Sequence, residues 1–327
     1  MYGTGQVQLE YGRDDVSIAG QKVAPNQLIG FTLAESSFPF ARLPFDGIVG
    51  LAYPRKGQDQ AFLSNLGHSG LFKQNFFSMY LSRDTHKPGV VSFGELPKGH
   101  VKEGEEVVWL PAIKESSWWE TDLVDILVDG KTLNVCGPSS KCTAVIDTGT
   151  SDITGPSLIM DSLLEHLSVS EDCMNFKQLP DIQFVFSDTD GKKVHFPLTR
   201  EEYVLQEVDE VMETPYCREL FSSEEVGDHK NLFIVGSPFL RSYVSVYDVD
   251  NARVGLVRSV HEGAPQKFVD ASEEPSHNVW DMIKADTDKY GVAGKTNPGN
   301  KFLAKRHGQA QTNIVYDAFS GFWNTLS

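Results

Sequence analysis

Residues 144–151 decide the fold, and they read Ala144-Val145-Ile146-Asp147-Thr148-Gly149-Thr150-Ser151. An apolar run leads into an acidic residue, a small turn residue and several hydroxyl side chains. Gly149 allows backbone amides to approach the Asp147 carboxylate, and Thr148 and Thr150 can hydrogen-bond to it. A carboxylate at the end of a buried strand is thereby held rigid while it can still ionise. Because Asp-Thr-Gly alone is a weak signal, the surrounding sequence decides how it is interpreted.

Composition and charge exclude several classes of partner and site. The chain has 327 residues and a net charge of -16, from 45 Asp and Glu against 29 Lys and Arg. This balance argues against nucleic acids and anionic membranes as partners, because both are bound through clustered cations. No apolar run is long enough to span a bilayer, and no basic segment followed by an apolar one marks a signal peptide. The histidines and cysteines lack metal-ligand spacing, so we predict no metal site.

The cysteines lie at positions 136, 142, 173 and 217. Sequential pairing gives Cys136–Cys142 and Cys173–Cys217, whose loops would contribute about 2 and about 4 kcal/mol in the chain-entropy model. Four buried free thiols are the alternative. We favour two disulfides, which imply an oxidising compartment.

The first 258 residues have the pattern of a mostly β protein. Short apolar runs of period two alternate with Gly, Pro, Asn and Asp, which is typical of strands and turns. Clear examples are Val7–Leu9, Val90–Phe93, Ile182–Phe186 and Tyr243–Tyr247. A helix is predicted over Ser157–Leu167, directly after Pro156.

The composition changes after Val260. Residues 261–278 are rich in Glu, Pro, Ser and Ala and are predicted to form a linker, and two short amphipathic patterns follow over 279–290 and 314–323. We predict a helical C-terminal extension whose aromatic face packs on the chain's own body. Binding of a protein partner is the alternative.

Several motifs occur in the order that is found in pepsin-like (A1 family) aspartic proteases, and the chain resembles that family from residue 2 to about 258. Tyr2-Gly3-Thr4-Gly5 resembles the tip of the flap, the hairpin that closes over substrate. Thr154-Gly155-Pro156 follows the Asp147 loop as it does in the family. The other matching segments are Pro44–Tyr53 (the strand that supports the first catalytic loop), Phe76–Leu81, Val91–Glu95, Phe233–Gly236 (the strand behind the second loop) and Val246–Asp248.

The resemblance implies a bilobal fold with an incomplete N-terminal lobe. Its expected parts are residues 1–112 (partial N-terminal lobe), 113–260 (C-terminal lobe) and 261–327 (linker and helical extension). It also implies hydrolysis of peptide bonds, without a cofactor, by two aspartates that share a proton, of which Asp147 is one. The residues expected to bind substrate or form the flap are Tyr2, Gly3, Thr4, Gly149, Thr150 and Ser151, and those expected to support the catalytic loop are Thr148 and Gly236.

The chain departs from the family pattern at three places. In family order the first catalytic aspartate precedes the flap, and only Met1 precedes Tyr2, so we expect truncation at the flap and little or no activity of this chain alone. Ser237 stands where the family usually has Asp. Asp152 stands where an apolar residue is common.

Three functions remain open. The first is an aspartic endopeptidase of which this chain is a fragment. The second is an inactive pseudo-protease that binds peptides or a protein. The third, ranked lowest, is a retroviral-style homodimer in which each chain supplies one Asp. We expect a polypeptide substrate, a monomer, and a place in the secretory pathway, either vacuolar or endosomal or extracellular.

Overall fold

The structure is a computed structural model that describes residues 6–18, 20–37, 40, 46–54, 61–70, 72, 74–84, 87–137, 140–208, 214–225, 229 and 231–261. The predicted flap residues Tyr2, Gly3 and Thr4 lie outside these residues. So does the predicted C-terminal extension, apart from His261. In the part of the chain that is described, no helix is long and apolar enough to cross a membrane.

Strands dominate the described chain, which confirms the predicted mostly β fold. One large sheet consists of β6 (Glu120–Val128), β7 (Lys131–Thr132), β8 (Cys142–Ile146), β9 (Ile153–Gly155), β10 (Ile182–Ser187), β11 (Lys193–Leu198), β14 (Phe221–Ser223) and β15 (Leu232–Val235). A second sheet consists of β3 (Phe76–Tyr80), β4 (Val90–Phe93), β5 (Val108–Pro111), β16 (Tyr243–Asp248) and β17 (Arg253–Arg258). The remaining strands form two hairpins, β1 (Val7–Ile18) with β2 (Gln21–Glu35) and β12 (Val204–Val208) with β13 (Pro215–Glu219).

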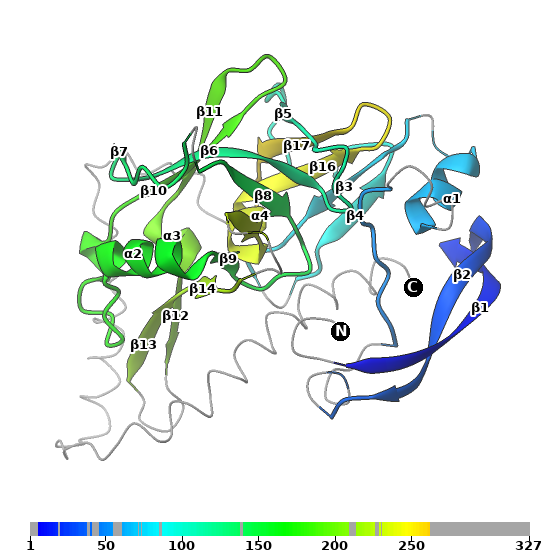
Figure 1. Ribbon diagram of the computed structural model, residues 1–327, viewed down its shortest axis with the longest axis horizontal. Coiled ribbons are helices and arrows are strands. Elements are labelled where there is room, and N and C mark those ends of the chain that lie inside the picture. Colours follow the sequence, from blue (N-terminus) through cyan, green and yellow to red (C-terminus); the bar gives the residue numbers. More distant parts are fainter. Residues whose placement is uncertain are drawn as a thin grey trace. The chain divides into compact units, whose positions relative to one another are not determined.

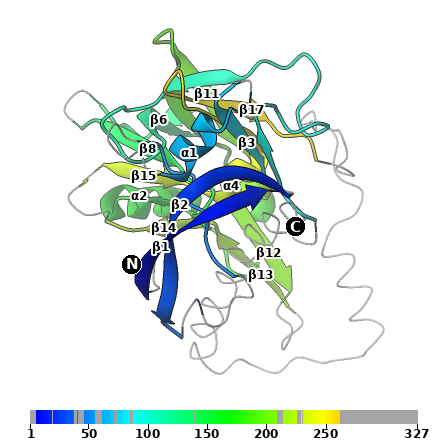
Figure 2. The ribbon, with the colours of Figure 1, turned by 90° about the vertical axis from the view of Figure 1, so that its right-hand side faces the viewer.

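The large sheet places the Asp147 loop. Its order is β11-β10-β6-β8-β15-β9-β14, with β7 also paired to β6. Strand β15 lies between β8, to which it is parallel, and β9, to which it is antiparallel. Figure 2 shows β15 beside β8. The chain therefore leaves β8 at Asp147, turns, and returns as β9 on the far side of β15. Such a crossing fixes both ends of the loop to one strand.

The second sheet has the order β4-β3-β16-β17-β5. Its central strand β16 is buried at every residue, and its Tyr and Val side chains suit a strand covered on both faces. It joins residues 76–111 to residues 243–258, which lie on opposite sides of the predicted boundary at residue 112. The division into three parts therefore stays a prediction.

The helices are short. They are α1 (Phe62–His68), α2 (Ser157–Leu167), α3 (Arg200–Tyr203), α4 (Ser237–Ser242) and a 3-10 helix over Phe176–Gln178. The predicted helix over Ser157–Leu167 is confirmed with the same bounds, and it buries Met160, Leu163 and Leu167. Leu158, which the apolar pattern also contains, is 87% exposed. Helix α1 lies against β2, where Asn65 donates to Gln27 Oε1 at 2.7 Å (Figure 1).

The segment expected to support the first catalytic loop does not form a strand. Its described residues, 46–53, have no strand assignment. A strand needs a neighbour with which to exchange backbone hydrogen bonds, and the described chain offers none here. Side-chain contacts help to hold this segment instead, among them the hydrogen bond from Trp119 Nε1 to Leu51 O at 2.8 Å.

Both predicted disulfides are present. Cys136 is joined to Cys142, and Cys173 to Cys217. The second closes a separation of 44 residues and links the loop after α2 to β13. The described chain contains no free cysteine.

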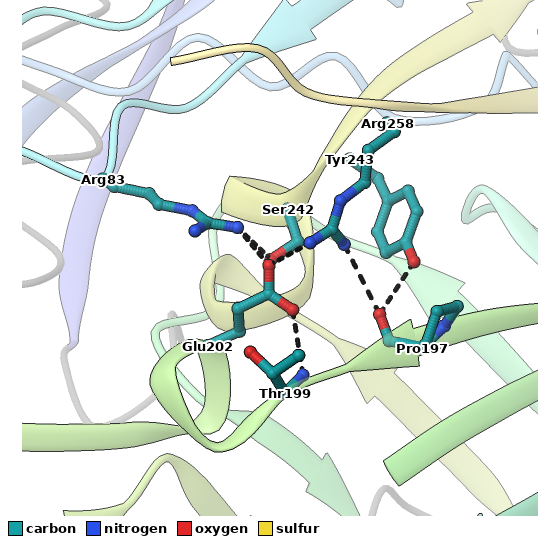
Figure 3. A network of polar contacts seen from close by, with 7 residues as sticks. All are labelled: Arg83, Pro197, Thr199, Glu202, Ser242, Tyr243 and Arg258. Carbon is teal, nitrogen blue, oxygen red and sulfur yellow. Dashed lines mark hydrogen bonds and ion pairs between the residues drawn. The ribbon is translucent and has the colours of Figure 1, made fainter. Parts of the chain in front are cut away.

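A buried ion-pair cluster joins three parts of the chain. The Glu202 carboxylate on α3 accepts hydrogen bonds from Arg83, in the loop after β3, and from Arg258 on β17 (Figure 3). It also accepts from Thr199 N at 3.0 Å, as part of a capping box. The Glu202 side chain is 2% exposed. Because a buried carboxylate is stable only when it is paired, these two cations determine where α3 lies against the second sheet.

Candidate active site

Asp147 directly follows β8, and its carboxylate is held by its own loop. Gly149 N donates to Oδ1 at 2.9 Å, and Thr150 Oγ1 donates to Oδ2 at 2.7 Å. The Asp147 amide donates to Val235 O on β15 at 3.2 Å. Both carboxylate oxygens thus have a fixed donor, and the backbone is tied to a central strand.

Two glycines allow this close packing. A Cβ on Gly149 would lie 3.2 Å from Asp147 Oδ1, which is tighter than most real contacts. A Cβ on Gly236 would lie 2.3 Å from Asp152 O and 2.4 Å from Thr150 O, which no side chain can tolerate without backbone movement. Gly236 therefore lets the end of β15 pass directly behind the loop. This geometry is consistent with the predicted supporting role of Gly236.

Ser237 continues the support from Gly236. Its amide donates to Thr150 O at 2.9 Å and its hydroxyl donates to the same oxygen at 3.1 Å. Since Thr150 in turn donates to Asp147, the serine at this position positions the carboxylate indirectly. Sequence reasoning identified Ser237 only as a departure from the family pattern.

Asp152, the other departure, is buried. Its carboxylate forms an ion pair with Arg218 on β13 at 3.6 Å, and both side chains are largely inaccessible. The charge that replaces an apolar residue is thus countered by a cation from another element. Nothing in the sequence pattern pointed to Arg218, because the two residues are 66 positions apart in the sequence and meet only through the fold.

A cavity of about 420 Å³ opens beside Asp147. Thr148 and Gly149 also line it, whereas Thr150 is half-buried behind the carboxylate and Ser151 is not among the lining residues. The other walls are mainly apolar and come from residues 48–52, from β3 and β4, and from Trp118, Leu232 and Ile234. An acidic group in a largely apolar cavity of this size suits a substrate that is bound mostly by its side chains.

Aromatic side chains support the floor of the cavity. Trp119 is buried and packs edge-on against Tyr53 and Phe77, with ring centroids 4.9 and 6.0 Å apart. Its carbonyl accepts the Ile146 amide at 3.0 Å. Trp119 thus connects residues 51–53 to the strand that ends at Asp147.

The family assignment rests on the sequence comparison together with this geometry. Residues 1–259 match the family model of the eukaryotic aspartyl proteases. The chain belongs to the eukaryotic aspartyl protease family. Within this family it is similar to plasmepsin VI of Plasmodium berghei (strain Anka), with 37% identity over 267 residues that cover 80% of this chain and 60% of that protein.

Two further aspartyl protease relatives show the same coverage pattern. Plasmepsin VIII of Plasmodium berghei (strain Anka) is 30% identical over 264 residues, covering 79% of this chain and 70% of that protein. Pepsin A of Sus scrofa is 32% identical over 266 residues, covering 78% of this chain and 64% of that protein. The chain thus spans 60% of plasmepsin VI and 64% of pepsin A.

Proposed function

We propose that the protein is an aspartic endopeptidase and that Asp147 is one carboxylate of its catalytic pair. The observation that carries the proposal is the Asp147 carboxylate itself, which has a donor on each oxygen and lies in the wall of a cavity of about 420 Å³. A rigid carboxylate that faces a substrate-sized space is what general acid–base chemistry on a bound peptide requires.

Peptide hydrolysis in this arrangement needs a second carboxyl group. Two carboxyls that share one proton divide the work: the ionised one takes a proton from water, and the protonated one donates to the developing oxyanion. The 327 residues contain one Asp-Thr-Gly and no Asp-Ser-Gly. We therefore expect that the second carboxyl of the pair does not come from another Asp-Thr-Gly or Asp-Ser-Gly motif within these 327 residues.

The test compares two forms of the protein. One is the 327-residue chain, and the other is the product of the complete transcript of the gene. We expect no peptide hydrolysis from the first, and hydrolysis that a statine-type inhibitor blocks from the second. In the active form Asp147→Asn should abolish turnover, whereas Asp161→Asn, on the exposed face of α2, serves as the matched control.

Circular dichroism and the urea midpoint establish that both variants are folded before turnover is compared. Full turnover in folded Asp147→Asn would contradict the proposal. So would a complete transcript whose protein is folded, binds the statine inhibitor and never cleaves a peptide.

A second candidate function is peptide binding without catalysis. The single Asp-Thr-Gly and the apolar cavity favour it, since an apolar cavity can hold a peptide without a catalytic pair. Peptides that bind the complete protein and are recovered uncut over the whole pH range would support this candidate.

The compartment and the parts of the chain belong to the same proposal. The two disulfides support an oxidising compartment, hence the secretory pathway, a vacuole or endosome, or the cell exterior. The parts 1–112, 113–260 and 261–327, the monomeric state, and a protein partner for the extension stay predictions. Limited proteolysis and sedimentation of the purified chain would test the first two.

A further inference from the structure

The residue before Asp147 is held at both of its backbone groups. Ile146 N donates to Trp119 O at 3.0 Å, and Ile146 O accepts the hydroxyl of Tyr247 at 3.4 Å. Asp147 begins where β8 ends, so the position of the Ile146 carbonyl sets the direction in which the Asp147 backbone continues. The first contact comes from the strand region before β6, and the second from the other sheet.

Tyr247 is itself firmly placed. It lies on β16, is 2% exposed, and lines the same cavity as Asp147. Its ring stacks on Phe77, with centroids 4.5 Å apart and an interplanar angle of 11°, and meets the edge of Trp119 at 5.2 Å. A ring held on two sides leaves its hydroxyl little freedom, so the bond to Ile146 is set by packing.

The hydroxyl of Tyr247 stays protonated at acidic and neutral pH. Burial raises the pKa of the Tyr247 hydroxyl well above the usual value of 10.0, and the charge of Asp147 adds to the rise. A phenol that keeps its proton remains a donor to the Ile146 carbonyl.

We propose that Tyr247 is a positioning residue for Asp147, in which the hydroxyl ties the last residue of β8 to the second sheet and thereby fixes the carboxylate relative to the cavity. The proposal rests on the proposed catalytic role of Asp147. It assigns to β16 a function beyond packing: the strand carries the donor that aligns a loop belonging to a different sheet.

Tyr247→Phe tests the proposal, because it removes one oxygen and leaves the stacked ring in place. Tyr243→Phe is the matched control. Tyr243 lies four residues earlier on the same strand, is also buried, and donates to Pro197 O at 2.8 Å, away from the loop (Figure 3). Both variants lose one hydroxyl that donates to a backbone carbonyl, so a merely structural role predicts the same result for both.

Three readouts use the 327-residue chain and need no activity. In Tyr247→Phe we expect amide hydrogen exchange at Ile146 and Asp147 to be about tenfold faster, as the loss of one hydrogen bond implies. We also expect the carboxyl-carbon NMR signal of Asp147 to move. Tyr243→Phe should change neither. In the wild-type chain the Tyr247 hydroxyl proton should exchange slowly, which tests the bond without any variant.

Kinetics supply a fourth readout in the active form of the protein. There Tyr247→Phe should lower kcat about three- to tenfold and leave KM unchanged, whereas Tyr243→Phe should change neither. Equal NMR and exchange changes at Asp147 in the two variants, or a rapidly exchanging Tyr247 hydroxyl proton, would overturn the proposal. If no form of the protein cleaves peptides, the proposed function fails, while the NMR and exchange results still decide whether Tyr247 positions Asp147.

Discussion

Glu202→Gln should destabilise the protein strongly while changing its shape very little. The Glu202 side chain is 2% exposed and accepts from two guanidinium groups, those of Arg83 and Arg258. Glutamine has the same size and can still accept a hydrogen bond, but it has no charge. The two cations would then lose their counter-charge (Figure 3).

The magnitude follows from how exposed each partner is. Removing one member of a fully buried ion pair costs about 3–5 kcal/mol. Here the Arg83 and Arg258 side chains are 40% and 24% exposed, so in the variant water can still hydrate part of each guanidinium group. We therefore expect a loss of about 2–3 kcal/mol in the free energy of unfolding. With a urea slope of about 3 kcal/mol/M, this lowers the midpoint by about 0.7–1 M.

Urea unfolding followed by far-UV circular dichroism measures the change. Glu201→Gln is the matched control, because it makes the same substitution at the adjacent position, where the side chain is 55% exposed and pairs with Arg200. An exposed pair of this kind contributes less than about 1 kcal/mol. Equal midpoints for the two variants would refute the reasoning and show that the buried cluster does not hold α3 in place.

Three further predictions concern Gly236 behind the Asp147 loop, the buried Tyr243 and the disulfide between Cys173 and Cys217. Gly236→Ala, whose Cβ would lie 2.3 and 2.4 Å from backbone carbonyl oxygens, should cost at least about 2 kcal/mol in urea unfolding and abolish any turnover. Burial raises the pKa of Tyr243 to about 12 from 10.0, so the stability it contributes is present below pH 10 and is lost as the pH rises toward 12. Absorbance at 295 nm should show its ionisation coinciding with alkaline unfolding, and early ionisation in the folded state would contradict this. Replacing Cys173 and Cys217 together by Ala should lower the unfolding free energy by about 4 kcal/mol; an unchanged thermal midpoint would contradict the loop-entropy argument.

Local patterns predicted individual elements well. The strands expected around residues 7–9, 90–93, 182–186 and 243–247 are present, and α2 has the predicted bounds. In each case the period of the apolar residues matches the burial of one face or of the whole strand, and turn residues mark the ends. The predicted strand over Pro44–Tyr53 was wrong. Its described residues, 46–53, have the apolar pattern of a strand but no neighbouring strand in the described chain with which to pair.

The candidate site was predicted only in part, for a similar reason. Asp147, Thr148, Gly149 and Thr150 lie together because they are adjacent in the chain, and a short motif is enough to identify them. Of the residues that hold this loop from outside, Gly236 was expected from the resemblance to the family. Ser237, Arg218 and Tyr247 were not assigned such a role, because their contacts with the loop region depend on the fold and are not visible in a single sequence.

By itself, the sequence determined the family, the mostly β class, the pairing of the cysteines and the acidic loop at Asp147. The family, the fold class and the acidic loop depend on residues near one another in the chain or on motifs in a fixed order, and the cysteine pairing was the sequential one. Gly236 was expected to support this loop, but only the tertiary structure decided how it is held: Ser237 on Thr150, Arg218 against Asp152, and the Tyr247 hydroxyl on the Ile146 carbonyl. The physical reason is that burial and hydrogen-bond geometry depend on distances in space, and the crossing of β15 between β8 and β9 brings Gly236 and Ser237 against the loop that begins at Asp147.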